Sequence, residues 1–150
     1  SQLASDVAGS KVIGGNDVAI YQLGRVETTG YDVADAVLDG KQEEALLALR
    51  NAIETGTDPV LITSAIASSL RTLAKVSGAS RGVKSYELAS SLALAPWQID
   101  KARRQLPKWS PSTLAAATVA IAQADADIKG AAADPIHSLE RAVIAITGSV

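Results

Sequence analysis

The side chains that could ligate a metal ion or transfer protons are few and scattered. The chain contains one histidine, His137, and no cysteine. Zinc sites group Cys, His and carboxylate ligands, so a histidine without such neighbours predicts a structural residue. Asp125 and Asp127 would point about 200° apart on a helix, whereas Asp125 and Lys129, at i and i+4, predict a surface ion pair. We therefore expect no metal site.

Motifs for phosphate binding and nucleophilic catalysis are also not expected. A P-loop ends in Gly-Lys-Ser or Gly-Lys-Thr after an upstream glycine. Gly40–Lys41 is followed by Gln42 and lacks that glycine, and Gly14–Gly15 has no lysine in the required place. We expect no nucleophile elbow either. The sequence therefore predicts no catalytic residues, no cofactor and no enzymatic activity in this chain.

The segment 85–108 is the strongest candidate for binding a charged partner. It contains two short apolar-faced stretches separated by a turn, which is the spacing of a helix-turn-helix motif. The second stretch carries Lys101, Arg103 and Arg104, and Lys108 follows it. In a DNA-binding protein these cations would contact phosphates while the helix entered the major groove. A helix-turn-helix DNA-binding domain is therefore the alternative hypothesis.

Two positions in this segment argue against reading of DNA sequence. Ala93 stands where helix-turn-helix motifs usually place glycine, and Gln98 is the one obvious base-reading side chain at the start of the second helix. Trp97 and Trp109 flank the basic helix. We expect each tryptophan to anchor the core rather than to stack on bases.

We expect these residues to lie on helices, because apolar side chains recur at helical spacing from residue 31 onward. Asp58–Pro59, Ser110–Pro111 and Asp134–Pro135 each place a capping side chain before a proline in the first helical position. The predicted fold class is all-α, a bundle of about six to eight helices. The expected helices cover residues 31–38, 41–55, 59–76, 85–92, 96–105, 111–129 and 135–147.

The composition is consistent with a helical domain that has an aliphatic core. Hydrophobic residues make up 47% of the chain, aromatic residues only 3%, and phenylalanine is absent. The formal charge of −2 argues against a protein that coats nucleic acid. No apolar run reaches the length of about 18 residues that spans a membrane. Without a signal sequence or cysteines, the expected location is the cytoplasm.

The composition changes at Gly30, where we place a domain boundary. Residues 1–8 and 16–23 predict short helical pieces joined by irregular segments, so residues 1–30 are expected to be the end of a preceding domain and a linker. Residues 31–150 are expected to form the helical domain. Because the chain begins with Ser1 rather than Met, we expect it to be part of a longer protein.

Two helices near the end of the chain are predicted to be apolar nearly all round. Such a helix is either deeply buried or in contact with partners on more than one side. A central helix in a bundle and a subunit interface are both consistent with this pattern, because exposed apolar surface usually marks a contact site. The candidate interface residues beside the two core faces are Val119, Ala122, Ala142, Ile144 and Ala145.

Taken in order, three segments resemble the C-terminal part of the delta subunit of bacterial DNA polymerase III, the clamp-loader subunit. YDVADAVLDGKQEEALLALRNAIETGTDPVLI is similar to the start of that family's third domain. ELASSLALAPWQIDKARRQLPKWSPSTLAAA, with its Pro96–Trp97 pair, is similar to the middle. ADADIKGAAADP is similar to the end, through an Ala-Asp…Lys-Gly pattern formed by Asp125, Asp127, Lys129 and Gly130. The resemblance covers about residues 24–150.

The resemblance implies a fold and a role. Residues 31–150 would be a helical collar domain that joins loader subunits into a ring, and residues 1–30 would be the end of an AAA+-type lid domain. The implied partners are subunits of the gamma/tau and delta-prime type. The sliding clamp would be contacted only through an N-terminal domain outside this chain, and an indirect contact with DNA in the assembly is kept as an alternative. The implied role is non-catalytic and belongs to DNA replication.

Overall fold

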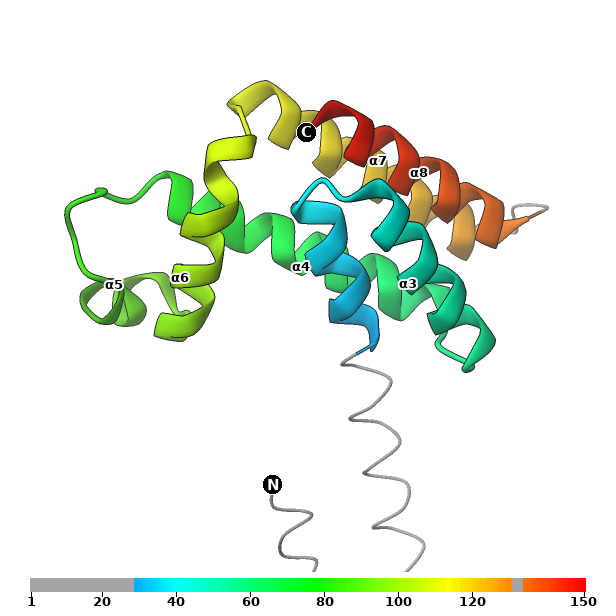
Figure 1. The fold of residues 1–150 in the computed structure, drawn as a ribbon, viewed down its shortest axis with the longest axis horizontal. Helices are drawn as coiled ribbons and strands as arrows, with labels where there is room; N and C mark the ends of the chain where they lie inside the picture. Colours follow the sequence, from blue (N-terminus) through cyan, green and yellow to red (C-terminus); the bar gives the residue numbers. More distant parts are fainter. Residues whose placement is uncertain (1–28, 131–133) are drawn as a thin grey trace, which may run out of the picture.

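The computed structural model describes residues 29–130 and 134–150 (Figure 1). Within these ranges all regular secondary structure is helical, so the predicted all-α class is confirmed. The short helices expected before residue 29 lie outside the described residues, and the boundary at residue 30 stays a prediction. The helices are 29–38, α3 (Gln42–Glu54), α4 (Pro59–Ser77), α5 (Ser85–Leu92), α6 (Pro96–Gln105), the 3₁₀ turn η1 (Leu106–Lys108), α7 (Pro111–Lys129) and α8 (Pro135–Ser149).

Helix α4 is the centre of the arrangement, because it packs against α6, α7 and α8. Helices α7 and α8 lie side by side along one edge of the molecule, and α3 packs against α8 (Figure 1). Helices α5 and α6 form a hairpin that projects from the opposite end. The outer sides of α7 and α8 therefore belong to one side of the bundle, and the α5–α6 hairpin lies away from α8.

The predicted capping pattern is confirmed at three helix starts. The side chains of Asp58, Ser110 and Asp134 each accept a hydrogen bond from a backbone N–H in the first turn, at 2.9, 3.1 and 3.0 Å. Proline follows each of them in the first helical position. These caps satisfy N–H groups that have no partner inside the helix, which explains why α4, α7 and α8 begin where they do.

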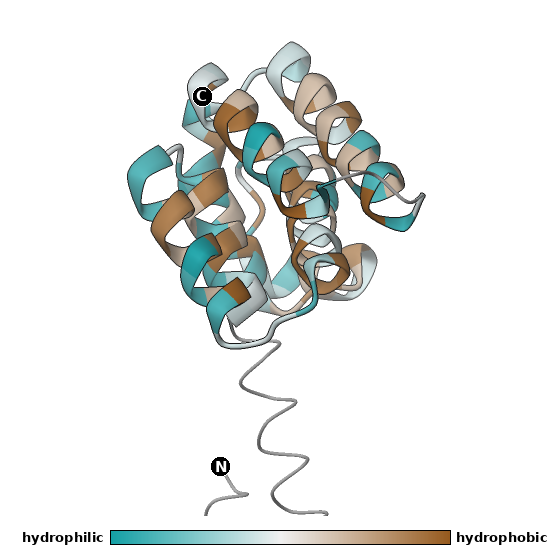
Figure 2. Ribbon diagram, turned by 90° about the vertical axis from the view of Figure 1, so that its right-hand side faces the viewer, coloured by the Kyte–Doolittle hydropathy of each residue, from teal (hydrophilic) through white to brown (hydrophobic). Residues whose placement is uncertain are grey.

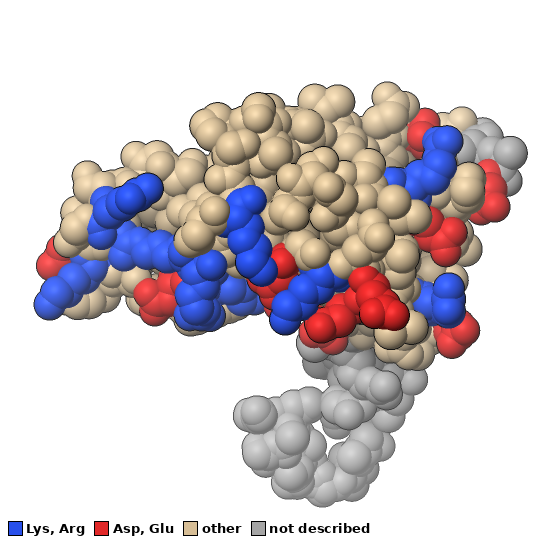
Figure 3. Space-filling view, turned by 45° about the horizontal axis from the view of Figure 1, so that its top comes forward, with Lys and Arg blue, Asp and Glu red and all other residues tan. Residues whose placement is uncertain are grey.

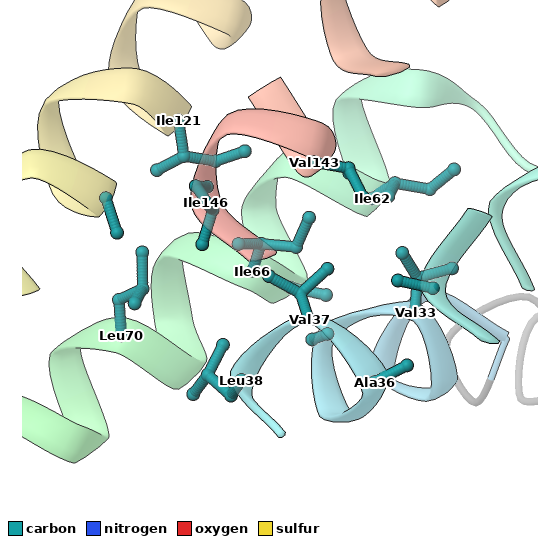
Figure 4. Packing of buried hydrophobic residues seen from close by; sticks show 14 of the residues in the cluster. Val33, Ala36, Val37, Leu38, Ile62, Ile66, Leu70, Ile121, Val143 and Ile146 are labelled. Atoms are coloured by element: carbon teal, nitrogen blue, oxygen red, sulfur yellow. The ribbon is translucent and has the colours of Figure 1, made fainter. Parts of the chain in front are cut away.

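The core is aliphatic, as predicted, and it joins helices from both ends of the chain. Helix 29–38 contributes Val33 and Val37, and α8 contributes Val143 and Ile146 (Figure 4). Helix α4 supplies fully buried residues such as Ile66 between them. Burying each of these side chains stabilises the fold by about 1.5–3 kcal/mol.

The beginning and the end of the described domain are joined by specific contacts. The Gln42 side-chain amide donates to the Ile144 carbonyl at 3.3 Å and to the Thr147 hydroxyl at 3.1 Å. Gly40 has a φ of +73°, and a Cβ placed there would lie 3.1 Å from Cγ1 of Val150. The positive φ favours glycine at this turn, and a larger residue would also have to push the Val150 side chain aside. The contacts hold α8 on α3, while Ile144 and Ala145 of α8 stay exposed.

The described helices include none that is long and apolar enough to cross a lipid bilayer.

Candidate protein-interaction site

Helix α7 carries no charged side chain from Pro111 to Ala124. Its inner side buries Ala117, Ile121 and Ala124. In Figure 2, α7 is mainly pale or brown, and teal is concentrated near its end at the 131–133 trace. Helices that face water normally carry charged or polar residues on that side. A second apolar face without such residues needs an explanation beyond the intramolecular core.

That second face is a stripe of small and medium apolar residues. Val119 is 69% exposed. The residues of the stripe follow one another at intervals of four, three and four positions, so they lie on one side of the helix. We call this set the α7 outer face, and its members are Ala115, Val119, Ala122 and Ala126, all exposed.

Helix α8 continues this apolar surface. Ile144 is 46% exposed, and Ala145 is exposed beside it. Figure 3 shows a broad area over α7 and α8 with few Lys, Arg, Asp or Glu side chains. Ala142, in contrast, is only 8% exposed and belongs to the core, which corrects its expected place on the surface. It lies in the stripe that α8 turns inward, three positions after Leu139.

A groove of about 440 Å³ runs along one side of the α7 outer face, between α4 and α7. At one end, the Thr63 hydroxyl donates to Oδ1 of Asp125 at 2.9 Å, and Lys129 Nζ lies 2.8 Å from Oδ2. The predicted Asp125–Lys129 pair is therefore confirmed. The hydrogen bond from Lys129 is the main cause that lowers the pKa of Asp125; the Thr63 bond and the Lys129 charge add to it, and partial burial opposes it. The groove is lined by Thr63, Ser64, Ala67, Leu70, Arg71, Ala74, Thr118, Ile121, Ala122 and Asp125.

The cations of the predicted basic patch mostly make contacts within the domain. Lys101 Nζ lies 3.0 Å from Oδ1 of Asp35, Arg103 donates to the Ser80 carbonyl at 3.2 Å, and Lys108 donates to the Asp39 carbonyl at 2.7 Å. These bonds hold α6 and η1 against helix 29–38 and the loop before α5. Arg104 is exposed. The four cations therefore do not form one free row for phosphates.

The turn between α5 and α6 does not have the residues expected of a helix-turn-helix motif. Ala93 adopts the left-handed conformation, with φ 57° and ψ 44°, in the place where glycine was expected. The Gln98 side chain accepts a hydrogen bond from the Ala95 N–H at 2.8 Å, so it caps α6. The side chain expected to read bases is therefore used to begin the helix.

The two tryptophans have different environments. Trp109 packs against the core, and its indole N–H donates to the Leu38 carbonyl at 3.0 Å, so the expectation of a core anchor is confirmed. Trp97 is 62% exposed, so the same expectation is wrong there. It lies in the first turn of α6, where its ring centroid is 5.2 Å from Lys101 Nζ.

No arrangement for catalysis forms among the described residues. Residues 78–82 do spell Gly-x-Ser-x-Gly, contrary to expectation, but they form a loop between two helices instead of a strand-to-helix elbow. His137 stands exposed in the first turn of α8. The described part of the chain contains no group of three or more His, Cys, Asp or Glu side chains that could hold a metal ion.

Comparison with known families identifies the domain. The family model described as DNA polymerase III delta subunit, C-terminal domain, matches residues 27–146. The chain belongs to this family. The resemblance found in the sequence segments is thereby confirmed. No curated protein matched the chain in a separate search.

A solved structure supports the delta C-terminal fold. The Bacillus subtilis DNA clamp loader delta protein (YqeN) superposes with a TM-score of 0.72 at 20% sequence identity. The match covers 98% of this chain and 44% of the YqeN chain, so the present chain spans less than half of that protein. The helical arrangement of α4, α7 and α8 is therefore an arrangement that a delta C-terminal domain adopts.

Proposed function

We propose that this domain is the collar part of a clamp-loader delta subunit and that it binds other loader subunits without catalysing a reaction. The observation that carries the proposal is the α7 outer face, which is exposed and apolar. It lies on a helix that has no charged side chain over the 14 residues from Pro111 to Ala124. Membership in the delta C-terminal family supplies the context of DNA replication. The sliding clamp would be handled by a part of delta outside this chain.

The physical basis is the free energy gained when apolar surface leaves water. Protein interfaces deplete charged residues at their centre and favour apolar contact. Val119 and Ile144 are large aliphatic side chains exposed on neighbouring helices, and the small alanines around them allow another helix to approach closely. Subunits of the gamma/tau and delta-prime type are the proposed partners, because a collar joins related helical domains.

The test is complex formation between this chain and the purified remaining loader subunits, followed by gel filtration and light scattering. Val119→Arg places a charge in the centre of the α7 outer face and should prevent the complex. Leu47→Arg is the matched control, because Leu47 is also a large exposed aliphatic residue, at 58%, but lies on α3. If the unaltered chain elutes alone in the presence of every loader subunit, the proposal is wrong.

A second candidate function is contact with DNA inside the assembly, through the α5–α6 hairpin and its flanks. The segment from Lys75 to Lys108 holds seven Lys or Arg and two Asp or Glu, a net charge of +5 in a chain whose total is −2. Tyr86 and Trp97 are 65% and 62% exposed within it. Basic side chains interleaved with exposed aromatic rings suit a nucleic-acid strand, whose bases stack on such rings.

Fluorescence anisotropy with labelled single strands and duplexes tests this contact in the presence and absence of the loader subunits. The expected affinity falls steeply with salt, because bound phosphates release counterions. Trp97→Ala should weaken binding of a single strand, whereas the helix-turn-helix alternative predicts preference for a duplex and loss on changing Arg103 and Arg104 to Glu. Absence of binding to either form at low salt would remove both.

A further inference from the structure

The α4–α7 groove is open along most of its length. Ser64, Arg71 and Ala74 from α4 and Thr118 and Ala122 from α7 are all exposed where they line it. The lining residues on α4 run from Thr63 to Ala74, and a helix rises 1.5 Å per residue, so the groove is about 17 Å long. This length accommodates about three turns of another helix.

The lining determines what kind of surface fits into the groove. The rim consists mainly of alanine, serine and threonine, and larger side chains, Leu70 and Ile121, form its buried floor. Helices pack by inserting large side chains of one into spaces left by small side chains of the other. The complementary surface is therefore a helix that presents Leu, Ile or Val to the groove.

Charge at the two ends of the groove is unequal. Both carboxylate oxygens of Asp125 already have partners, Thr63 and Lys129. Arg71 is exposed, and among the described residues it has neither an ion pair nor a hydrogen bond. Guanidinium groups favour bidentate pairing with carboxylates. An occupant that complements this groove therefore places Asp or Glu opposite Arg71.

We propose that the α4–α7 groove receives an amphipathic helix of a neighbouring clamp-loader subunit, with aliphatic side chains on the alanine rim and a carboxylate on Arg71. The inference rests on the proposed collar function and adds the position and chemistry of one contact. The groove adjoins the α7 outer face through Ala122, so one neighbour can cover both.

Two substitutions test the groove by different means, and each leaves the core untouched. Ala122→Trp fills the groove, and Arg71→Glu reverses its unpaired charge. Ser90→Trp is the matched control: Ser90 is also a small exposed residue, but it lies on α5, in the hairpin away from α8, and does not line the groove. The binding constant of each variant for each purified loader subunit is measured by calorimetry, after circular dichroism has shown unchanged helix content and melting.

The expected result is a loss of affinity of about tenfold or more for Ala122→Trp and Arg71→Glu, and little change for Ser90→Trp. Changing the partner's Asp or Glu that faces Arg71 to Lys should then restore binding to the Arg71→Glu variant, but not to the Ala122→Trp variant.

If both groove variants bind like the unaltered chain while Val119→Arg still prevents the complex, the groove inference is overturned and the collar function stands. If the unaltered chain binds no loader subunit, both fail. If instead the chain dimerises and Ala122→Trp abolishes the dimer, the occupant is a second copy, and the proposal is overturned as well.

Discussion

The contact between Trp109 and Leu38 makes a quantitative prediction about how the domain is held together. The indole N–H of Trp109 donates to the Leu38 carbonyl at 3.0 Å, across 71 positions of sequence. Leu38 is only 1% exposed and ends helix 29–38, where carbonyl groups have no partner inside the helix. Trp109→Phe keeps an aromatic ring but removes the donor, so the Leu38 carbonyl is left buried without it.

The expected cost follows from these contacts. A buried acceptor without its hydrogen bond costs about 1–3 kcal/mol, and the smaller phenylalanine ring leaves additional unfilled space against the core. We expect the free energy of unfolding to fall by about 2–3 kcal/mol. For a domain of this size, that corresponds to a decrease in Tm of about 8–12 °C.

Urea unfolding followed by circular dichroism measures this change without depending on the tryptophan signal. Trp97→Phe is the matched control: Trp97 is 62% exposed and the Lys101 ammonium lies 5.2 Å from its ring centroid, so the substitution should cost less than about 1 kcal/mol. Each variant also keeps one tryptophan, and Trp109 alone should emit at shorter wavelength than Trp97 alone. If Trp109→Phe costs no more than Trp97→Phe, the bond to Leu38 does not stabilise the domain.

Three further changes have expected outcomes. Ala93→Gly should stabilise the chain by about 0.5–1 kcal/mol, seen as a higher urea midpoint, because glycine adopts the φ of 57° without the cost that alanine bears; a lower midpoint would contradict this. Ile66→Ala should cost about 2–5 kcal/mol, because Ile66 is fully buried in the core and the cavity cannot be filled, and a loss below 1 kcal/mol in calorimetry would show that the core relaxes around it. The hydrogen bond from Lys129 lowers the pKa of Asp125 in the folded chain, so this carboxylate stabilises the fold above its unfolded pKa of about 3.9 and loses that effect as the pH falls through its folded pKa. Asp125→Asn should therefore weaken the dependence of the free energy of unfolding on pH in that acidic range. If that dependence is unchanged, Asp125 makes no such contribution.

Most of the helices could be predicted from the sequence, because their ends are marked by local chemistry. The Asp58–Pro59 and Ser110–Pro111 pairs predicted the starts of α4 and α7 from hydrogen bonds that act within one turn. The spacing of aliphatic residues then predicted which side of each helix is buried. The family resemblance rested on the same local signals in their order along the chain.

The errors concern residues whose burial depends on distant parts of the chain. Trp97 was expected to anchor the core, but its side chain lies in the first turn of α6 and is 62% exposed. Ala142 was expected at an interface because α8 is apolar on nearly every side. The spacing of its apolar residues therefore did not show which of them face the core, where Ala142 lies. The α4–α7 groove was not predicted, because it depends on the pairing of two helices about 50 positions apart.

The bonds from Gln42 to α8 join residues 102 and 105 positions apart, and the same core holds Val33 and Ile146. Synthesis on the ribosome proceeds from the first helix to the last, so the core remains incomplete until α8 emerges. Closing so large a loop costs chain entropy before the contacts between its ends can stabilise the fold. A chain truncated before α8 would therefore lack Val143 and Ile146 and would leave aliphatic residues of the remaining core exposed to water.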